Sequence, residues 1–135
     1  NLEIGKAITI KDGKDLTIMA TGNMLENSSK AVELLEKQGL SVRFLSFPTV
    51  RPVDQVAILE SAQKTKAIFT IEENFESGGL GTEVAEVLAA NSAAIRFKKI
   101  ALPHRYPSEI GSQNYMRSLY GLMPEQIAEK IKASL

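Results

Sequence analysis

The sequence predicts an α/β fold in which a mainly parallel sheet carries helices on both faces. Short apolar runs of strand length alternate along the chain with longer segments in which apolar residues recur at helical spacing. One of the short runs, Leu16–Ala20, is almost continuously apolar, as expected for a strand that is buried on both faces of a parallel sheet. No repeat, linker or low-complexity segment interrupts this pattern, so residues 1–135 are expected to form one domain.

Composition argues against several classes of function. The chain is 44% hydrophobic and 24% charged, and its 16 basic residues balance its 16 acidic ones, which gives no positive surface for nucleic acid or an anionic membrane. It has no Cys, and His104 is its one His, which excludes thiolate chemistry, disulfides and a multi-histidine zinc site within this chain. No apolar run approaches the ~20 residues of a membrane span. We expect no signal peptide and a cytoplasmic location, and the first residue, Asn1, suggests a fragment or a processed product.

The first third of the chain predicts two strands and a helix. Residues 4–10 alternate weakly between apolar and polar side chains and predict a short strand. Asp12-Gly13 favours a turn, so from these residues alone we pair that strand with Leu16–Ala20 as a hairpin. The next helix reaches about Gln38, and Gly39 stands where a helix C-cap belongs.

The rest of the chain repeats the strand and helix alternation. A strand is predicted over residues 41–47 and ends at the Pro48–Pro52 segment. Asp54 is a good N-cap for a helix that runs to Lys64. The remaining elements are a strand over residues 67–71, a loop, a helix over residues 82–90, a strand over residues 97–102, a short helix over residues 113–119 and a last helix from Pro124.

The loop after the strand at residues 67–71 is the main candidate for a site. Gly78, Gly79 and Gly81 precede a helix, and the N–H groups at a helix N-terminus can bind an anion. However, the glycine spacing matches neither common nucleotide-binding motif, and the carboxylates of Glu72 and Glu73 just upstream would repel a phosphate. We therefore favour glycines that allow close backbone packing against a neighbouring surface, and keep the anion site as the alternative.

Glu72 and Glu73 could act as an acid and base pair. Adjacent residues of an extended chain point to opposite faces, however, so the two carboxylates are not expected to form a dyad. We expect one of them to hold a backbone N–H group or an Arg side chain across an interface instead.

Three further positions lie near strand ends. Thr21-Gly22 leaves a strand that is central in such topologies, so it should form a crevice with the 72–81 loop at the point where α/β sheets bind ligands. Arg51 suits an ion pair better than a bound anion. His104 would need a partner group to act in catalysis, and the sequence contains no nucleophile elbow.

The order of these landmarks resembles the C-terminal domain of transketolase-like enzymes. Arg51-Pro52-Val53-Asp54 is similar to a step of that family, and Thr70-Ile71-Glu72-Glu73 followed by Gly78-Gly79-Leu80-Gly81 is similar to its main signature. Asp15–Gly22, Leu102-Pro103 and Tyr120-Gly121-Leu122 complete the likeness, which covers nearly the whole chain. Many relatives carry Asp where this chain has His104, which leaves the subfamily open.

The resemblance implies a three-layer α/β/α fold with a mostly parallel five-stranded sheet and one antiparallel edge strand, which conflicts with the hairpin above. It also implies a dimeric transferase of the pentose phosphate pathway that uses thiamine diphosphate and Mg²⁺. Those groups are held by a pyrimidine-binding and a diphosphate-binding domain outside this chain, which has no counterpart of the family's Gly-Asp-Gly motif. On this view residues 1–135 hold no catalytic, cofactor or metal-binding residue, and serve domain packing and dimer assembly.

Under this reading the candidate residues become interface and loop positions rather than catalytic ones. They are Thr21, Gly22, Arg51, Glu72, Glu73, Gly78, Gly79, Gly81 and His104. Transketolase, including the second half of a split enzyme, is our first choice. The same domain occurs in 1-deoxyxylulose-5-phosphate synthase and in the beta subunit of 2-oxo acid dehydrogenases. Two different classes remain as alternatives: a small-molecule binding module that uses the crevice, and free-standing catalysis by Glu72, Glu73 or His104.

Overall fold

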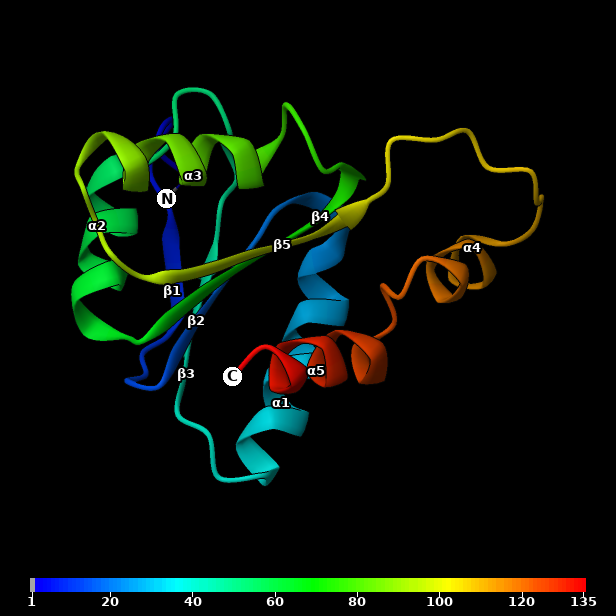
Figure 1. Ribbon diagram of the computed structural model, residues 1–135, viewed down its shortest axis with the longest axis horizontal. Helices are drawn as coiled ribbons and strands as arrows, with labels where there is room; N and C mark the ends of the chain where they lie inside the picture. The colour runs from blue at the N-terminus through cyan, green and yellow to red at the C-terminus, as the bar shows by residue number, and fades with distance from the viewer. Residues whose placement is uncertain (1) are drawn as a thin grey trace.

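Five strands form one mixed sheet at the centre of the molecule (Figure 1). In this computed structural model, which describes residues 2–135, the strands lie in the order β1-β3-β2-β4-β5. The pairs β3–β2, β2–β4 and β4–β5 are parallel, and β1 is antiparallel to β3 at one edge. The strands span Ile8–Lys11 (β1), Leu16–Ala20 (β2), Val42–Ser46 (β3), Ala67–Phe75 (β4) and Arg96–Leu102 (β5).

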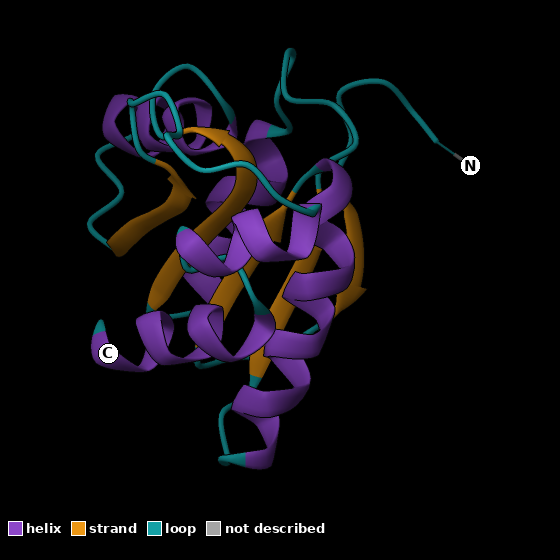
Figure 2. Ribbon diagram, turned by 90° about the vertical axis from the view of Figure 1, so that its right-hand side faces the viewer, coloured by secondary structure: helices purple, strands orange, loops and turns teal. Residues whose placement is uncertain are grey.

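Two pairs of helices cover the two faces of the sheet (Figures 1 and 2). Helices α1 and α5 pack on one face and on each other, and α2 and α3 pack on the opposite face. This arrangement confirms the three-layer α/β/α class. The helices span Leu25–Lys37 (α1), Gln55–Lys64 (α2), Leu80–Ala90 (α3), Gln113–Leu119 (α4) and Pro124–Ala133 (α5), and a 3₁₀ turn, η1, covers Gly22–Met24.

The two cores follow from the alternation of side chains along the central strands. All five residues of β2 are buried. Ile18 contributes to the core beneath α1 and α5, whereas its neighbour Met19 contributes to the core beneath α2 and α3. In β4, Phe69 and Ile68 divide in the same way. Because successive side chains of a strand point to opposite faces, a continuous apolar run is what a covered sheet requires.

The hairpin predicted across Asp12-Gly13 is wrong. β2 has parallel neighbours on both sides, so it offers no free edge, and β1 instead pairs with β3, with Ile8 opposite Ser46. The segment that contains Gly13 carries the chain past the start of β3, where a Cβ atom at Gly13 would overlap the backbone of Val42. The glycine therefore serves a close crossing rather than a tight hairpin turn, and the edge strand implied by the family resemblance is present.

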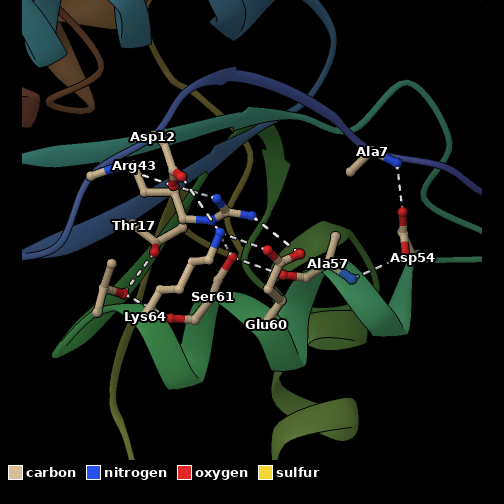
Figure 3. Close-up of polar contacts among 11 residues, drawn as sticks. Ala7, Asp12, Thr17, Arg43, Asp54, Ala57, Glu60, Ser61 and Lys64 are labelled. Atoms are coloured by element: carbon tan, nitrogen blue, oxygen red, sulfur yellow. Dashed lines mark hydrogen bonds and ion pairs between the residues drawn. The ribbon is translucent and has the colours of Figure 1, made fainter.

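A cluster of charges closes the amino end of the sheet (Figure 3). Arg43 of β3 is 2% exposed, and its Nη1 donates to Oδ1 of Asp12 at 2.6 Å while its Nε donates to Oγ of Ser61 at 3.0 Å. Glu60 and Lys64 of α2 complete the cluster. The Glu60 carboxylate forms an ion pair with the Arg43 guanidinium, and Lys64 Nζ lies 2.7 Å from Glu60 Oε1. The buried guanidinium is thereby paired and hydrogen-bonded, as a charge removed from water requires.

At the N-terminus of α2, the predicted capping role of Asp54 is confirmed. Its Oδ1 accepts a hydrogen bond from the N–H of Ala57 at 3.1 Å, which satisfies an otherwise free donor of the first turn. Its Oδ2 accepts a second bond from the N–H of Ala7 at 2.9 Å (Figure 3). One carboxylate therefore fixes both the start of α2 and the segment that leads into β1.

The cluster predicts a pH-dependent contribution from Asp12. The hydrogen bond from Arg43 lowers the pKa of Asp12 below its ordinary value of 3.8. A lowered pKa in the folded state stabilises the protein above pH 3.8, and the contribution is lost as the pH falls through the folded-state pKa. Asp12→Asn should therefore reduce the free energy of unfolding at pH 7, and its difference from the wild type should shrink toward pH 3.

Urea unfolding at pH 7, 5 and 3 measures this difference. Glu129→Gln, which changes an exposed carboxylate of α5, is the matched control and should show only a small effect at each pH. A deficit for Asp12→Asn that is unchanged or larger at pH 3 would contradict the assignment.

Candidate functional site

A crevice lies beyond the carboxyl ends of β2 and β4, where the sequence predicts one. Its volume is about 430 Å³. The residues that line it lie at the ends of β2 and β4 and in the loops that precede α2 and α3. Its lining includes Thr21, Gly22, Asn23, Val50, Arg51, Glu72, Glu73, Asn74, Gly78 and Gly79. The topology therefore brings seven of the nine candidate residues to one place, and leaves Gly81 and His104 outside its lining.

Glu72 occupies the N-terminus of α3. Glu72 is 2% exposed. Its two carboxylate oxygens accept hydrogen bonds from the N–H groups of Leu80 at 3.0 Å and Gly81 at 2.7 Å. A carboxylate in this position satisfies two donors of the first helical turn and lies at the positive end of the helix dipole. The position in which a phosphate would bind to this helix is filled by the protein's own anion.

Two of the three glycines accommodate this arrangement. A Cβ atom at Gly79 would overlap Oε1 of Glu72, and one at Gly81 would lie 2.9 Å from Oγ1 of Thr70 and 2.7 Å from Cγ of Lys99. At these two positions the absent side chain makes room for side chains of the same domain, and the expected packing against a neighbouring surface stays a prediction. Gly78 differs, because it has a φ of +87° and open space around its Cα.

Glu73 points away from Glu72 and holds a different helix. Its carboxylate accepts two bonds from Arg117 of α4, from Nε at 3.0 Å and from Nη2 at 2.9 Å. Asn23 Nδ2 donates to the same carboxylate at 3.0 Å. A two-bond arginine–carboxylate pair is among the stronger hydrogen-bonded contacts in proteins. One acidic residue thus binds backbone N–H groups and its neighbour binds an arginine, and the two do not form a dyad.

Arg51 and Thr21 form the contacts that join the loops at the rim of the crevice. Arg51 Nε lies 2.6 Å from Glu83 Oε1, so the expected ion pair is present, and its Nη2 donates to the carbonyl of Gly78 at 2.9 Å. Thr21 Oγ1 donates to the carbonyl of Phe47 at 2.8 Å. These contacts tie the loops that follow β2, β3 and β4 to one another.

His104 lies outside the crevice, in the segment that follows β5. Its ring is exposed and stacks on Phe75, with ring centroids 4.8 Å apart and an angle of 15° between the planes. Within residues 2–135, no three His, Cys, Asp or Glu side chains lie close enough together to share a metal ion. None of the helices described is both long enough and apolar enough to cross a bilayer.

Comparison with known proteins decides the family. The family model described as "Transketolase, C-terminal domain" matches residues 5–127. This chain belongs to the transketolase C-terminal domain family. The sequence-based resemblance is thereby confirmed.

Relatives within the family include several different enzymes. The chain is 35% identical to 1-deoxy-D-xylulose-5-phosphate synthase of Syntrophotalea carbinolica, over 98% of this chain and 21% of that protein. It is 36% identical to the 6-deoxy-6-sulfo-D-fructose transketolase subunit SqwH of a Clostridium species, over 92% of this chain and 38% of that protein. These relatives are much longer, since the chain spans between about a fifth and two fifths of their length.

Among solved structures, a split-gene transketolase described as an inactive β4 tetramer superposes with a TM-score of 0.91. It is 30% identical in sequence, and the superposition covers 99% of this chain and 43% of that one. The transketolase C-terminal domain fold is therefore present over the whole described chain.

Arg117 is the residue of this transketolase C-terminal domain that sequence reasoning missed. It lies in the segment after β5 whose pattern is least regular, and it is 7% exposed although it carries a charge. Its partner Glu73 is 44 residues away in the chain. The sequence contains no local signal for such a pair, because both ends are defined only when β4 and α4 come together.

The contacts of Glu72 predict a selective loss of stability. In Glu72→Gln, an amide N–H₂ group replaces one acceptor oxygen and faces a buried backbone donor, so the free energy of unfolding should fall by about 1–3 kcal/mol. Glu76→Gln, at an exposed position of the same loop, should change it by less than about 0.5 kcal/mol. Urea unfolding of both variants at pH 7 measures this difference, and equal effects would show that Glu72 has no special structural role.

Proposed function

We propose that residues 1–135 are the non-catalytic C-terminal domain of a longer transketolase-like enzyme. In the intact protein the reaction is ketol transfer between sugar phosphates, as in the pentose phosphate pathway, in the cytoplasm. Support comes from the family match, from the likeness to a split transketolase, and from the small share of its relatives' length that the chain spans.

The observation that carries the non-catalytic assignment is the position of Glu72. Thiamine diphosphate needs donors for its diphosphate and ligands for the accompanying Mg²⁺. The N–H groups of Leu80 and Gly81 are already bonded to a carboxylate, and Glu73 and Arg51 are paired with Arg117 and Glu83. The residues of this crevice do not fit the cofactor. The cofactor and its metal therefore belong to the pyrimidine-binding and diphosphate-binding domains, in the same chain or in a separate subunit.

The role left for this domain is structural. It packs on the pyrimidine-binding domain and extends the interface of a homodimer. The stiff rim of the crevice supports such a role, because ion pairs and hydrogen bonds fix the loops after three strands relative to the sheet.

A second candidate is the same domain of 1-deoxyxylulose-5-phosphate synthase. The 35% identity to the enzyme from Syntrophotalea carbinolica over nearly the whole chain favours it as strongly as the 36% identity to a transketolase subunit favours the first choice. The two candidates share the cofactor and the fold, and they differ in the donor, which is a ketose phosphate for the first and pyruvate for the second.

Activity assays of the full-length enzyme and of residues 1–135 alone test the proposal. With thiamine diphosphate, Mg²⁺, a ketose phosphate donor and an aldose phosphate acceptor, the full-length enzyme should form the two-carbon transfer product. Pyruvate with glyceraldehyde 3-phosphate tests the second candidate. Residues 1–135 alone should form neither product. Turnover by this domain alone, or none by the full-length enzyme with either pair, would contradict the proposal.

A further inference from the structure

We propose that this domain binds a small monocarboxylate with an apolar body, such as an aromatic acid, in a second pocket between helix α4 and the ends of β4 and β5. This pocket has a volume of about 170 Å³. It shares Glu73 with the crevice and is otherwise lined by different residues, so the two are separate sites. Such a site goes beyond the structural role proposed above.

The way in which α4 is attached leaves room for this pocket. β5 ends at Leu102, which lies beside Phe75 of β4, and the chain then extends away from the sheet over residues 103–112 before it enters α4 (Figure 1). α4 packs only loosely on the other elements, and two hydrogen bonds from Arg117 to the Glu73 carboxylate hold it to the sheet. This polar attachment keeps the helix near the strand ends without filling the space between them with side chains.

The walls of the pocket are mostly apolar. Phe75 and Leu102 come from the two strand ends, Met116 comes from α4, and Tyr120 and Leu122 come from the turn that follows α4. An apolar cavity of about 150 Å³ is large enough to bind benzene. Pockets for drug-sized ligands start near ~300 Å³. The body of the ligand should therefore be apolar and about the size of one six-membered ring.

Arg105 also lines this pocket, and its guanidinium is left without an acceptor. The other four arginines of the sequence donate to carboxylates or to main-chain carbonyls, and they are Arg43, Arg51, Arg96 and Arg117. Within residues 2–135, no carboxylate lies within ion-pair distance of Arg105, whose guanidinium carbon lies 5.7 Å from the centre of the Tyr120 ring. The Arg105 N–H donates to the carbonyl of Pro103 at 2.8 Å, which fixes the turn that carries this side chain.

The charge of the lining selects a monoanion. Glu73 and Arg117 neutralise each other, which leaves Arg105 as the net charge of the pocket, whereas the charged groups of the crevice all have partners. A guanidinium matches a carboxylate, because two of its N–H groups can donate in parallel to the two oxygens. A phosphate carries about two negative charges, and its excess charge would be costly to place beside apolar walls. We therefore expect a monocarboxylate rather than a sugar phosphate or a nucleotide.

Titration of the full-length protein with two matched probes tests the site. The probes are 4-fluorobenzoate and 4-fluorobenzamide, which have nearly the same shape and differ in charge, and ¹⁹F NMR measures the dissociation constant of each. The benzoate should bind about fivefold more tightly, the upper end for an ion pair at an exposed position. Arg105→Gln should remove this preference. Arg96→Gln changes an exposed arginine outside the pocket, and it should leave the preference unchanged.

Methyl signals of ¹³C-labelled methionine show where the probe binds. Met116 lines the pocket, so saturating 4-fluorobenzoate should shift its methyl signal through the ring current of the bound probe. Met19 is fully buried in the core beneath α2 and α3, so its signal is the control and should not move. Met116→Leu and Met19→Leu assign the two signals.

Three outcomes would overturn the site. No binding of either probe below about 10 mM would show that the pocket is not open to a ligand in the full-length protein. Binding that leaves the Met116 signal in place would show that the probe occupies another part of the molecule. Equal affinities for the two probes, or a preference that survives in Arg105→Gln, would show that Arg105 does not bind the carboxylate. None of these measurements depends on transferase activity, so the site and the proposed function fail in distinguishable ways.

Discussion

The loop between β4 and α3 depends on one contact, in which the Glu72 carboxylate accepts hydrogen bonds from the N–H groups of Leu80 and Gly81. This contact places a negative charge at the positive end of α3 and joins that helix to the central sheet through a residue that is almost fully buried. It also explains Gly79, since any side chain there would displace the carboxylate. The floor of the crevice is therefore built from an anion that the protein supplies itself, which removes the most obvious binding function of a helix N-terminus.

Glu73 binds a partner on the opposite face of the sheet from Glu72, because successive side chains of β4 point to opposite faces. Along β4, Ile68, Thr70 and Glu72 face α2 and α3, whereas Phe69, Ile71 and Glu73 face the opposite side. Glu72 can therefore fix α3 while Glu73 fixes α4, although the two residues are adjacent in the chain. Continuing β4 to Phe75 makes this possible, because an extended backbone keeps the two carboxylates apart. The result is a rigid edge whose charges are paired, which suits contact with another domain better than capture of a small molecule.

Local sequence signals predicted most of the fold. Apolar runs and helical periodicity located the strands and helices, Asp54 marked a helix start, and topology placed the crevice beside Thr21. Non-local contacts decided the features that were missed. The neighbour of β1 depends on β2 already having two parallel partners, and Asp12-Gly13 gives no sign of this. β4 extends through Glu72 and Glu73, where polarity predicted its end, because both carboxylates find partners in other elements. Arg117 is a partner of this kind, and only the assembled fold identifies it.

Amide hydrogen exchange at Leu80 and Gly81, followed by NMR at pH 7, tests the central role of Glu72 most directly. First-turn N–H groups of a helix have no partner within the helix and normally exchange fast. If the Glu72 carboxylate holds them as described, both amides should exchange roughly 100-fold or more slowly than in an unstructured peptide, since exchange then requires the loop to open. Exchange of both amides within a few-fold of the unstructured rate would contradict the account, because the helix N-terminus would then be free to bind an external anion.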